Sequence, residues 1–163
     1  LGINSPIEDG ATFYENALIK AKHAATISGY PAIADDSGLC VDCINGAPGI
    51  KSARYAGENS SDAENNLKLL ESLENETQRN AAFVACLVFF DPNSNESPLS
   101  AEGRLEGEIA EDSKGKDGFG YDPIFYISEE NKTLAELGKV YKNKNSHRAK
   151  ATKILLNKLL KEK

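Results

Sequence analysis

The stretch Ala81-Ala82-Phe83-Val84-Ala85-Cys86-Leu87-Val88-Phe89-Phe90 is an unbroken apolar run near the middle of the chain. Apolar residues at every position, rather than at every second one, predict a strand that is buried on both faces at the centre of a sheet. The turn sequence Asp91-Pro92-Asn93-Ser94-Asn95 follows it. The moderately alternating segment 100–109 is then expected to run back antiparallel beside the central strand.

Two capping patterns mark helices that precede the central strand. Thr12-Phe13-Tyr14-Glu15 opens a segment with apolar residues at helical spacing, which predicts a helix over residues 12–28. A second pattern of this kind opens a helix over residues 61–75. Between them, residues 31–35 are expected to form a strand, and the Gly-rich residues 37–57 an extended loop with at most one short strand.

The C-terminal part of the chain also mixes strands and helices. Residues 113–120 form a Gly- and Lys-rich loop, residues 124–127 a short strand and residues 133–137 a short helix, and a last helix starts at Ser146. The 163 residues are enough for one domain with a substantial core. The order of elements predicts a single α/β domain over residues 1–163, built on a mixed sheet.

Composition excludes several classes of protein. The formal net charge of −6 argues against a surface that coats nucleic acid, which is normally basic. It leaves room for a small anionic ligand in a local cationic pocket. No apolar stretch approaches the roughly 20 residues of a membrane span, so no membrane partner is expected. Because no signal peptide is recognisable, a cytoplasmic location is the expectation.

The chain has three cysteines, and two of them, Cys40 and Cys43, have the spacing C-x-x-C. An odd count without secretory features indicates reduced thiols. A redox or zinc role needs a helix N-terminus or a second pair of ligands. Neither is evident, so these cysteines are interpreted as small residues flanking Val41 in a loop or strand.

Adjacent carboxylates, Asp35 and Asp36, end the apolar run of residues 31–34 and are expected in the turn at the carboxyl end of that strand, where α/β sheets bind ligands. Two like charges are costly there unless a cation or proton balances them. The reaction that benefits most from such a pair of carboxylates is Mg²⁺-assisted attack on a phosphate. The alternative is that one Asp caps the turn while the other is solvated. Glu8 precedes the first helix without a structural duty, so Glu8 and Asp36 would suffice to hold Mg²⁺ with substrate phosphates. Glu15 is already explained by its capping pattern.

A second candidate is the segment Gly118-Phe119-Gly120-Tyr121-Asp122-Pro123. Its glycines let the backbone approach a ligand closely. Phe119 can stack on a base and Asp122 can accept a hydrogen bond from a ring N–H. The alternative is a structural turn that enters a strand, with its aromatic rings in the core.

A third candidate lies at the start of the last helix, where Ser146 is a plausible N-cap. His147 and Arg148 then occupy the first turn, where cations oppose the helix dipole. Cations in that position indicate a ligand that compensates them, together with the preceding Lys142. The alternative is an ordinary basic, solvated end of the chain.

Taken in order, these pieces resemble the inosine triphosphate pyrophosphatase family, which acts on nonstandard purine nucleoside triphosphates. Each piece is weak or moderate alone, but the ordered set spans nearly the whole chain and is highly specific. The matching stretches are Thr12-Phe13-Tyr14-Glu15-Asn16-Ala17 with Lys20-Ala21, Ala34-Asp35-Asp36-Ser37-Gly38-Leu39, Gly46-Ala47-Pro48-Gly49, Ser52-Ala53-Arg54-Tyr55, Gly118-Phe119-Gly120-Tyr121-Asp122-Pro123-Ile124-Phe125, Thr133-Leu134-Ala135-Glu136-Leu137 and Ser146-His147-Arg148-Ala149.

The resemblance implies a fold and an activity. The fold is an elongated mixed central sheet flanked by helices, related to that of Maf-type proteins. The activity is Mg²⁺-dependent hydrolysis of inosine, deoxyinosine and xanthosine triphosphates (ITP, dITP and XTP) between the α- and β-phosphates. The products are the monophosphate and pyrophosphate, and the expected role is cleansing of the nucleotide pool. The resemblance also implies a homodimer.

The resemblance assigns roles by position. Asp36 matches the general base and metal-associated carboxylate, and Glu8 matches the upstream Mg²⁺ ligand. The remaining positions are those that contact the substrate. They are Ser37, the segment Phe119, Gly120, Tyr121 and Asp122 that holds base and sugar, Lys142 that helps to read the base, and the pair His147 and Arg148 that completes the pocket.

The physics of base recognition fits this assignment. Hypoxanthine and xanthine carry an oxygen acceptor where adenine has an amino donor. A pocket of cationic donors therefore favours them and leaves its donors unpaired against adenine, at a cost of about 1–3 kcal/mol each. Guanine shares the oxygen and must be rejected through its exocyclic amine.

One departure from the family pattern limits the expected activity. Family members begin with a strand and a phosphate-binding loop of Thr-Gly-Asn type, and this sequence starts after that segment. We therefore expect weak or no activity from residues 1–163 alone. Two alternatives follow, a nucleotide-binding fragment or paralogue without catalysis and a Maf-type nucleotide pyrophosphatase. Comparing ITP binding with pyrophosphate release tests the first, and a substrate panel tests the second.

Overall fold

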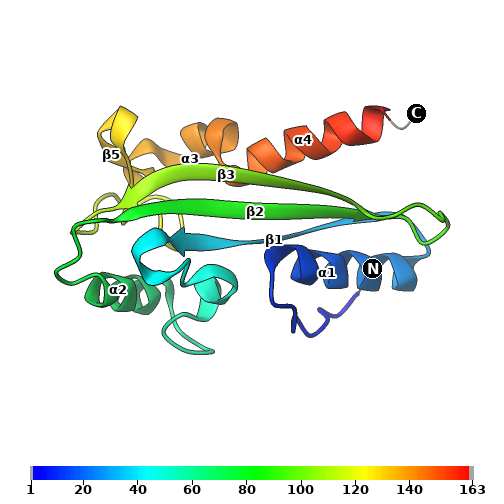
Figure 1. Ribbon diagram of the computed structural model, residues 1–163, viewed down its shortest axis with the longest axis horizontal. Coiled ribbons are helices and arrows are strands. Elements are labelled where there is room, and N and C mark those ends of the chain that lie inside the picture. Colours follow the sequence, from blue (N-terminus) through cyan, green and yellow to red (C-terminus); the bar gives the residue numbers. More distant parts are fainter. Residues whose placement is uncertain (1, 162–163) are drawn as a thin grey trace.

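The computed structural model describes residues 2–161 as an elongated α/β molecule (Figure 1). Its elements in chain order are α1 Phe13–Ser28, β1 Ala32–Val41, the short 3-10 helices η1 Asp42–Ile44 and η2 Gly49–Arg54, α2 Asp62–Ser72, β2 Asn80–Phe90, β3 Leu99–Ile109, β4 Phe125–Ile127, the 3-10 helix η3 Ser128–Glu130, β5 Lys132–Thr133, α3 Leu134–Asn145 and α4 His147–Lys161.

The sheet has the strand order β1-β2-β3-β4-β5. The apolar run forms β2, which is hydrogen-bonded to β1 on one side and to β3 on the other, as predicted. Within residues 2–161 every strand pairing is antiparallel, where the order of elements in the sequence predicts a mixed sheet. The antiparallel pairing of β2 with β3 follows from the connection through residues 91–98, which is too short for the crossover that a parallel pair needs.

Strand β1 is longer than predicted, and this corrects the placement of the acidic pair. Its register with β2 runs from Ala32 opposite Phe90 to Val41 opposite Ala81, so the long apolar strand supplies partners for the whole of β1. Asp35 and Asp36 therefore lie inside the strand and not in a turn at its end. The expected loop over residues 37–57 begins only after Val41.

Gly38 explains why the Ser-Gly sequence does not form a turn. It lies within β1, where an added Cβ would collide with the backbone of Gly49 and the side chain of Ser52. The Ser52 hydroxyl also accepts a hydrogen bond from Leu39 N at 2.8 Å. Gly38 thus permits η2 to pack directly on the strand, and this contact folds the Gly-rich segment back against the sheet.

Helices cover both faces of the sheet, with α1 and α2 on one face and α3 and α4 on the other (Figure 1). Helix α1 packs on β1 and β2 through small residues that include Ala17 and Ala21. Helix α4 packs on β3 and β2 through Ala151 and Leu155. At Gly103 in β3 an added Cβ would collide with backbone atoms of α4, so this glycine allows the close approach of that helix.

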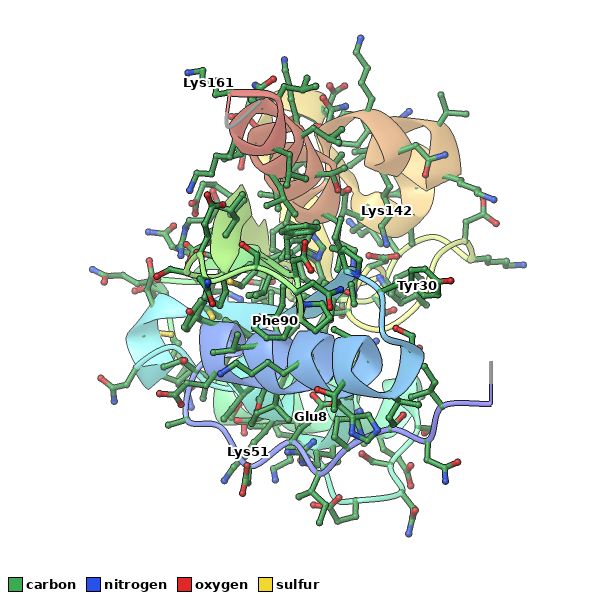
Figure 2. The ribbon with its side chains drawn as sticks, turned by 90° about the vertical axis from the view of Figure 1, so that its right-hand side faces the viewer. Glu8, Tyr30, Lys51, Phe90, Lys142 and Lys161 are labelled. Atoms are coloured by element: carbon green, nitrogen blue, oxygen red, sulfur yellow. The ribbon has the colours of Figure 1, made fainter. Side chains whose placement is uncertain are left out.

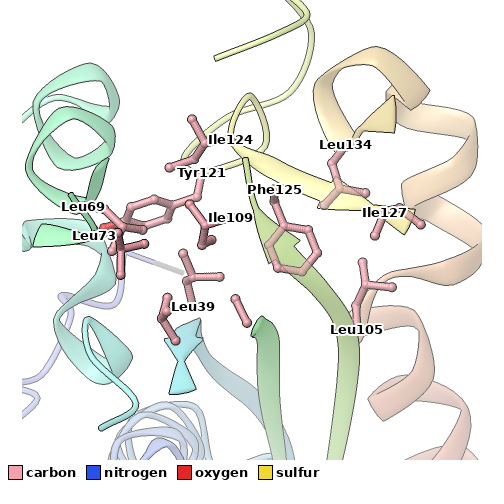
Figure 3. Packing of buried hydrophobic residues seen from close by; sticks show 12 residues of the cluster. Leu39, Leu69, Leu73, Leu105, Ile109, Tyr121, Ile124, Phe125, Ile127 and Leu134 are labelled. Atoms are coloured by element: carbon pink, nitrogen blue, oxygen red, sulfur yellow. The ribbon is translucent and has the colours of Figure 1, made fainter. Parts of the chain in front are cut away.

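The largest apolar cluster lies at one end of the sheet, between the helix layers (Figure 3). Leu69 of α2 and Leu73, which caps the end of that helix, meet Ile109 of β3 and Tyr121 of the following loop there. Burying each large apolar side chain stabilises the fold by about 1.5–3 kcal/mol. This core fixes α2 and the 118–124 segment relative to the sheet.

The predicted capping patterns are present in the structure. Thr12 Oγ1 accepts a hydrogen bond from Glu15 N at 3.1 Å, and Ser61 forms a reciprocal capping box with Glu64. Ser146 Oγ accepts from Ala149 N at 3.2 Å at the start of α4. Helix α3 is longer than the predicted short helix, and it contains a non-helical residue, Gly138, with φ of 72°. Among residues 2–161, no helix has the length and apolar character needed to cross a membrane.

Candidate functional site

Asp36 points from β1 toward α1, where its carboxylate meets a lysine. Lys20 Nζ donates to Asp36 Oδ1 at 3.0 Å and to Glu8 Oε2 at 2.9 Å, and Asn16 Nδ2 donates to Asp36 Oδ2 at 3.2 Å. Burial by itself would lower the pKa of Lys20, but the hydrogen bonds to Glu8 and Asp36 raise it above its usual value. Lys20 therefore stays cationic and holds the two predicted metal-binding carboxylates on either side of its ammonium group.

The carboxylates beside Lys20 are suitable ligands for a magnesium ion, but two of them do not complete its coordination. Substrate oxygens would have to supply the remaining ligands. Glu8 and Asp36 offer the hard carboxylate oxygens that Mg²⁺ prefers, and one or two carboxylates with phosphate oxygens are a common arrangement. Within the described part of the chain, no group of three or more His, Cys, Asp and Glu side chains is placed to hold a metal by itself.

Asp35 points to the opposite face of β1, toward α4. Arg148 Nε donates to Asp35 Oδ2 at 2.8 Å, and an Arg148 terminal nitrogen donates to Ser37 Oγ at 2.7 Å. Because Asp35 and Ser37 are two residues apart on one strand, their side chains share a face. One guanidinium group thus bridges both of them, and the ion pair is about half exposed.

The loop before β4 brings its aromatic ring next to a cation. Asp122 is 1% exposed and accepts hydrogen bonds from Lys142 Nζ at 2.6 Å and from Phe119 N at 3.0 Å. Phe119 is 64% exposed, and Lys142 Nζ lies 4.0 Å from its ring centroid. The buried carboxylate therefore anchors both the lysine and the loop, while the ring remains open to a ligand.

His147 is buried beside an aromatic ring of the sheet. Its imidazole stacks on Phe83 with centroids 5.1 Å apart and an interplanar angle of 13°. Desolvation, together with the nearby charges of Arg148 and Lys142, lowers the pKa of His147 to about 4. The side chain is therefore neutral at pH 7, and within residues 2–161 its Nδ1 has no hydrogen-bond partner. One buried polar atom is thus left free to meet a ligand.

These side chains surround a cavity of about 190 Å³ between α2 and η2 on one side and α3 and α4 on the other. Phe83 and Leu39 of the sheet also line it. Every residue predicted to bind substrate lines the cavity: Ser37, Phe119, Gly120, Tyr121, Asp122, Lys142, His147 and Arg148.

Glu8 and Asp36 do not line the cavity. Viewed along the sheet, Glu8 lies by α1 and Lys142 lies on the other side of the sheet with α3 (Figure 2). The predicted residues thus fall into two groups, a pocket and a carboxylate pair, which β1 connects through Asp36 and Ser37. Their contacts with substrate stay predictions.

Tyr121 belongs to the pocket wall and to the core at the same time. It is 4% exposed, and its hydroxyl donates to the Ser52 carbonyl at 2.8 Å. Burial, with smaller effects of Tyr55 and Asp62, raises the pKa of Tyr121 well above its ordinary value. Tyr121 therefore acts as a rigid, uncharged support for the segment that carries Phe119.

Sequence reasoning missed Lys20, Asn16 and Phe83 as site residues. Lys20 and Asn16 lie four residues apart on α1, and this helical spacing could have pointed to a shared face that includes a cation. Nothing in the sequence pattern marked Phe83 as a site residue, because an aromatic residue in an apolar run is ordinarily part of the hydrophobic core. Cys40 and Cys43 are free cysteines in β1 and η1, and Cys43 packs against the largest apolar cluster.

The fold and the pocket define an α/β protein whose site pairs exposed aromatic and cationic groups with nearby carboxylates. The chain belongs to the Ham1 family, whose model matches residues 1–158. A protein of Haemophilus influenzae named dITP/XTP pyrophosphatase is 53% identical over 161 residues, which cover 98% of this chain and 83% of that protein. The resemblance to the inosine triphosphate pyrophosphatase family is thereby confirmed.

Solved structures show the same relationship. A HAM1 protein from Coxiella burnetii has a TM-score of 0.92 at 46% identity, covering 99% of this chain and 82% of that one. The Ham1 protein of Staphylococcus aureus has a TM-score of 0.90 at 47% identity, covering 96% and 81%. The predicted fold is that of these proteins, with the sheet pairings described above.

Proposed function

We propose that this protein hydrolyses nonstandard purine nucleoside triphosphates, dITP, XTP and ITP, to the monophosphate and pyrophosphate. The name of the Haemophilus influenzae relative supports this substrate class. The observation that carries the proposal is the pocket itself, in which Lys142, Arg148 and neutral His147 gather beside the exposed Phe119 ring. Next to that pocket, β1 presents Asp36 toward a cation and a second carboxylate.

The pocket suits a purine that carries an oxygen at its six position. The exposed ring of Phe119 offers a face on which a base stacks. Lys142 and Arg148 are donors only, so they match an oxygen acceptor and oppose the amino group of adenine. A donor left unpaired costs about 1–3 kcal/mol, which amounts to roughly a fivefold to 150-fold preference.

On the other side of β1, we assign the role of general base to Asp36. Hydrogen bonds from Lys20 and Asn16 orient its carboxylate. Asp36 accepts the proton of the water that attacks the α-phosphorus, the bond from that phosphorus to the bridging oxygen breaks, and pyrophosphate leaves. Mg²⁺ held by Glu8, Asp36 and the phosphates would supply charge neutralisation. Lys20 adds a fixed positive charge beside the same groups.

The test is a pyrophosphate-release assay with ITP, dITP, XTP, dATP and dGTP, with and without Mg²⁺. We expect release from the first three at least tenfold faster than from dATP, and dependence on Mg²⁺. Binding of ITP without release would favour the non-catalytic alternative. Equal or faster release from other nucleotides would favour a Maf-type activity and contradict the proposal.

A homodimer in the cytoplasm completes the proposal. The dimer rests on the family resemblance alone, and light scattering in solution tests it.

A further inference from the structure

One backbone residue of the pocket loop is held from both sides by a single helix. Asp62 Oδ2 accepts a hydrogen bond from Gly120 N at 2.6 Å, and Asn66 Nδ2 donates to Gly120 O at 3.1 Å. Asp62 and Asn66 lie one turn apart on α2, so their side chains share a face of the helix. The contacts join segments that are 58 and 54 residues apart in the sequence.

Neither side chain caps the start of α2. The reciprocal capping box of Ser61 and Glu64 already caps the start of the helix, so Asp62 has no capping duty. Asn66 is buried, and within residues 2–161 its Oδ1 has no partner. The Gly120 carbonyl is therefore the contact that orients the Asn66 amide, and a helix-forming apolar residue would serve α2 as well at this position.

The backbone conformation of Gly120 allows these contacts to orient the neighbouring residue, Phe119. Gly120 has φ of 59°, in the left-handed region that glycine adopts readily. With both of its polar backbone groups bound, the orientation of the preceding peptide is set. That peptide carries Phe119, whose ring is the exposed wall of the pocket.

Helix α2 also holds the facing wall. The neighbouring Asn65 accepts from Ala56 N at 2.7 Å through Oδ1 and donates to Ala53 O at 3.2 Å through Nδ2. Adjacent residues of α2 thus hold both the 53–56 segment and the 118–122 loop, and both of these segments contribute to the cavity wall. Helix α2 therefore helps to set the distance between the walls, alongside the contact of Asp122 with Phe119 N.

We propose that Asp62 and Asn66 are positioning residues that hold the Phe119 ring at the spacing required to stack a purine base, and so determine base affinity and selectivity. This rests on the proposed function, because the base is the ligand assigned to the Phe119 face. Asp62 itself lines the cavity, and the contact that Asp62 and Asn66 share is with the backbone of Gly120.

The test compares D62A and N66A with D62N and with E64A. D62N retains an oxygen acceptor for Gly120 N, and E64A weakens the cap of α2 without touching Gly120. Binding of the non-hydrolysable α,β-imido analogue of dITP is measured by calorimetry. Inorganic triphosphate, which has no base, is measured in the same way, and amide hydrogen exchange is followed at Gly120.

We expect D62A and N66A to weaken binding of the dITP analogue about tenfold and to leave triphosphate binding within twofold of the wild type. Gly120 exchange should accelerate at least tenfold in D62A, and D62N and E64A should resemble the wild type in both measurements. Unchanged exchange at Gly120, equal losses for both ligands, or an E64A variant as impaired as D62A would each overturn the proposal. Exchange at Gly120 needs no ligand, so failure of the wild type to bind the dITP analogue would count against the proposed function separately.

Discussion

Asp35 and Asp36 are neighbours in the chain, yet they form ion pairs on opposite faces of the sheet. Asp35 Oδ2 pairs with Arg148 of α4 at 2.8 Å, and Asp36 Oδ1 pairs with Lys20 of α1 at 3.0 Å. Their side chains alternate because both lie inside β1. Strand β1 therefore carries Asp35 on the pocket side, where it binds Arg148. It carries Asp36 on the opposite side, which is the side proposed for phosphate chemistry.

Replacing Asp36 by Asn should abolish turnover while leaving the fold in place. The amide keeps the size of the side chain but cannot accept the proton from the attacking water, and general-base catalysis is worth roughly 10²–10⁴-fold. Pyrophosphate release measures the loss, and circular dichroism checks the fold. Near-normal release from the variant would show that Asp36 is not the general base.

Replacing Lys142 by Met should destabilise the protein by about 3 kcal/mol, because it leaves the buried Asp122 carboxylate without its cationic partner. Chemical denaturation measures the change. The matched control is Lys144→Met in the same helix, since Lys144 is exposed and forms no ion pair within residues 2–161.

A second substitution separates charge from packing at this position. Adding Asp122→Asn to the Lys142→Met variant removes the stranded charge, so at least half of the lost stability should return. Equal stability of the Lys142→Met and Lys144→Met variants would rule out a structural role for the ion pair.

His147 should make stability depend on pH between about 6.5 and 4. Its pKa is about 4 in the folded protein, mainly through desolvation, and 6.5 is the ordinary value expected on unfolding. The unfolded chain thus binds more protons in this window, so the contribution is fully present above pH 6.5 and is lost as the pH falls toward 4. The loss at pH 4 amounts to about 3 kcal/mol.

The measurement for this prediction is the free energy of unfolding at several pH values for the wild type and for His147→Gln. Glutamine does not titrate, so the difference between the two proteins should shrink or reverse toward pH 4, independently of other groups. Parallel pH profiles would show that His147 is not buried in its neutral form.

Substituting Gly103 by Ala should destabilise the protein by about 1–3 kcal/mol and weaken nucleotide binding. The added methyl group would collide with the backbone of α4 at His147 and Ala151, which must move away from β3. Thermal unfolding and dITP affinity measure the two effects. Glu102→Ala, at an exposed position on the same strand, should change stability by less than about 0.5 kcal/mol. If the Gly103→Ala variant were destabilised but bound dITP with unchanged affinity, nucleotide binding would not depend on the close packing of α4 against β3.

Local patterns in the sequence were sufficient for most elements. The helix starts at Thr12 and Ser61 and the strand from the apolar run all depend on neighbouring residues, and the structure confirms them. The same locality explains the errors. The length of β1 and the extension of α3 to Asn145 depend on packing partners that are distant in the chain.

The pocket residues could be named from the sequence because they occur in short, ordered motifs that resemble one family. Which of them meet could not be predicted in this way. The pairing of Lys142 with Asp122 spans 20 residues, and that of Arg148 with Asp35 spans 113. The contacts of Lys20 also needed the irregular segment before α1 to fold back along that helix and place Glu8 there.

By itself, the sequence determined the family, the central strand and the residue types available for chemistry, because these follow from local composition, periodicity and motif order. Only the tertiary structure decided that Asp35 and Asp36 serve different faces and that α2 holds the Phe119 loop. The physical reason is register. A shift of one residue between β1 and β2 would exchange the faces of both carboxylates, and that register is set by long-range pairing with the apolar strand.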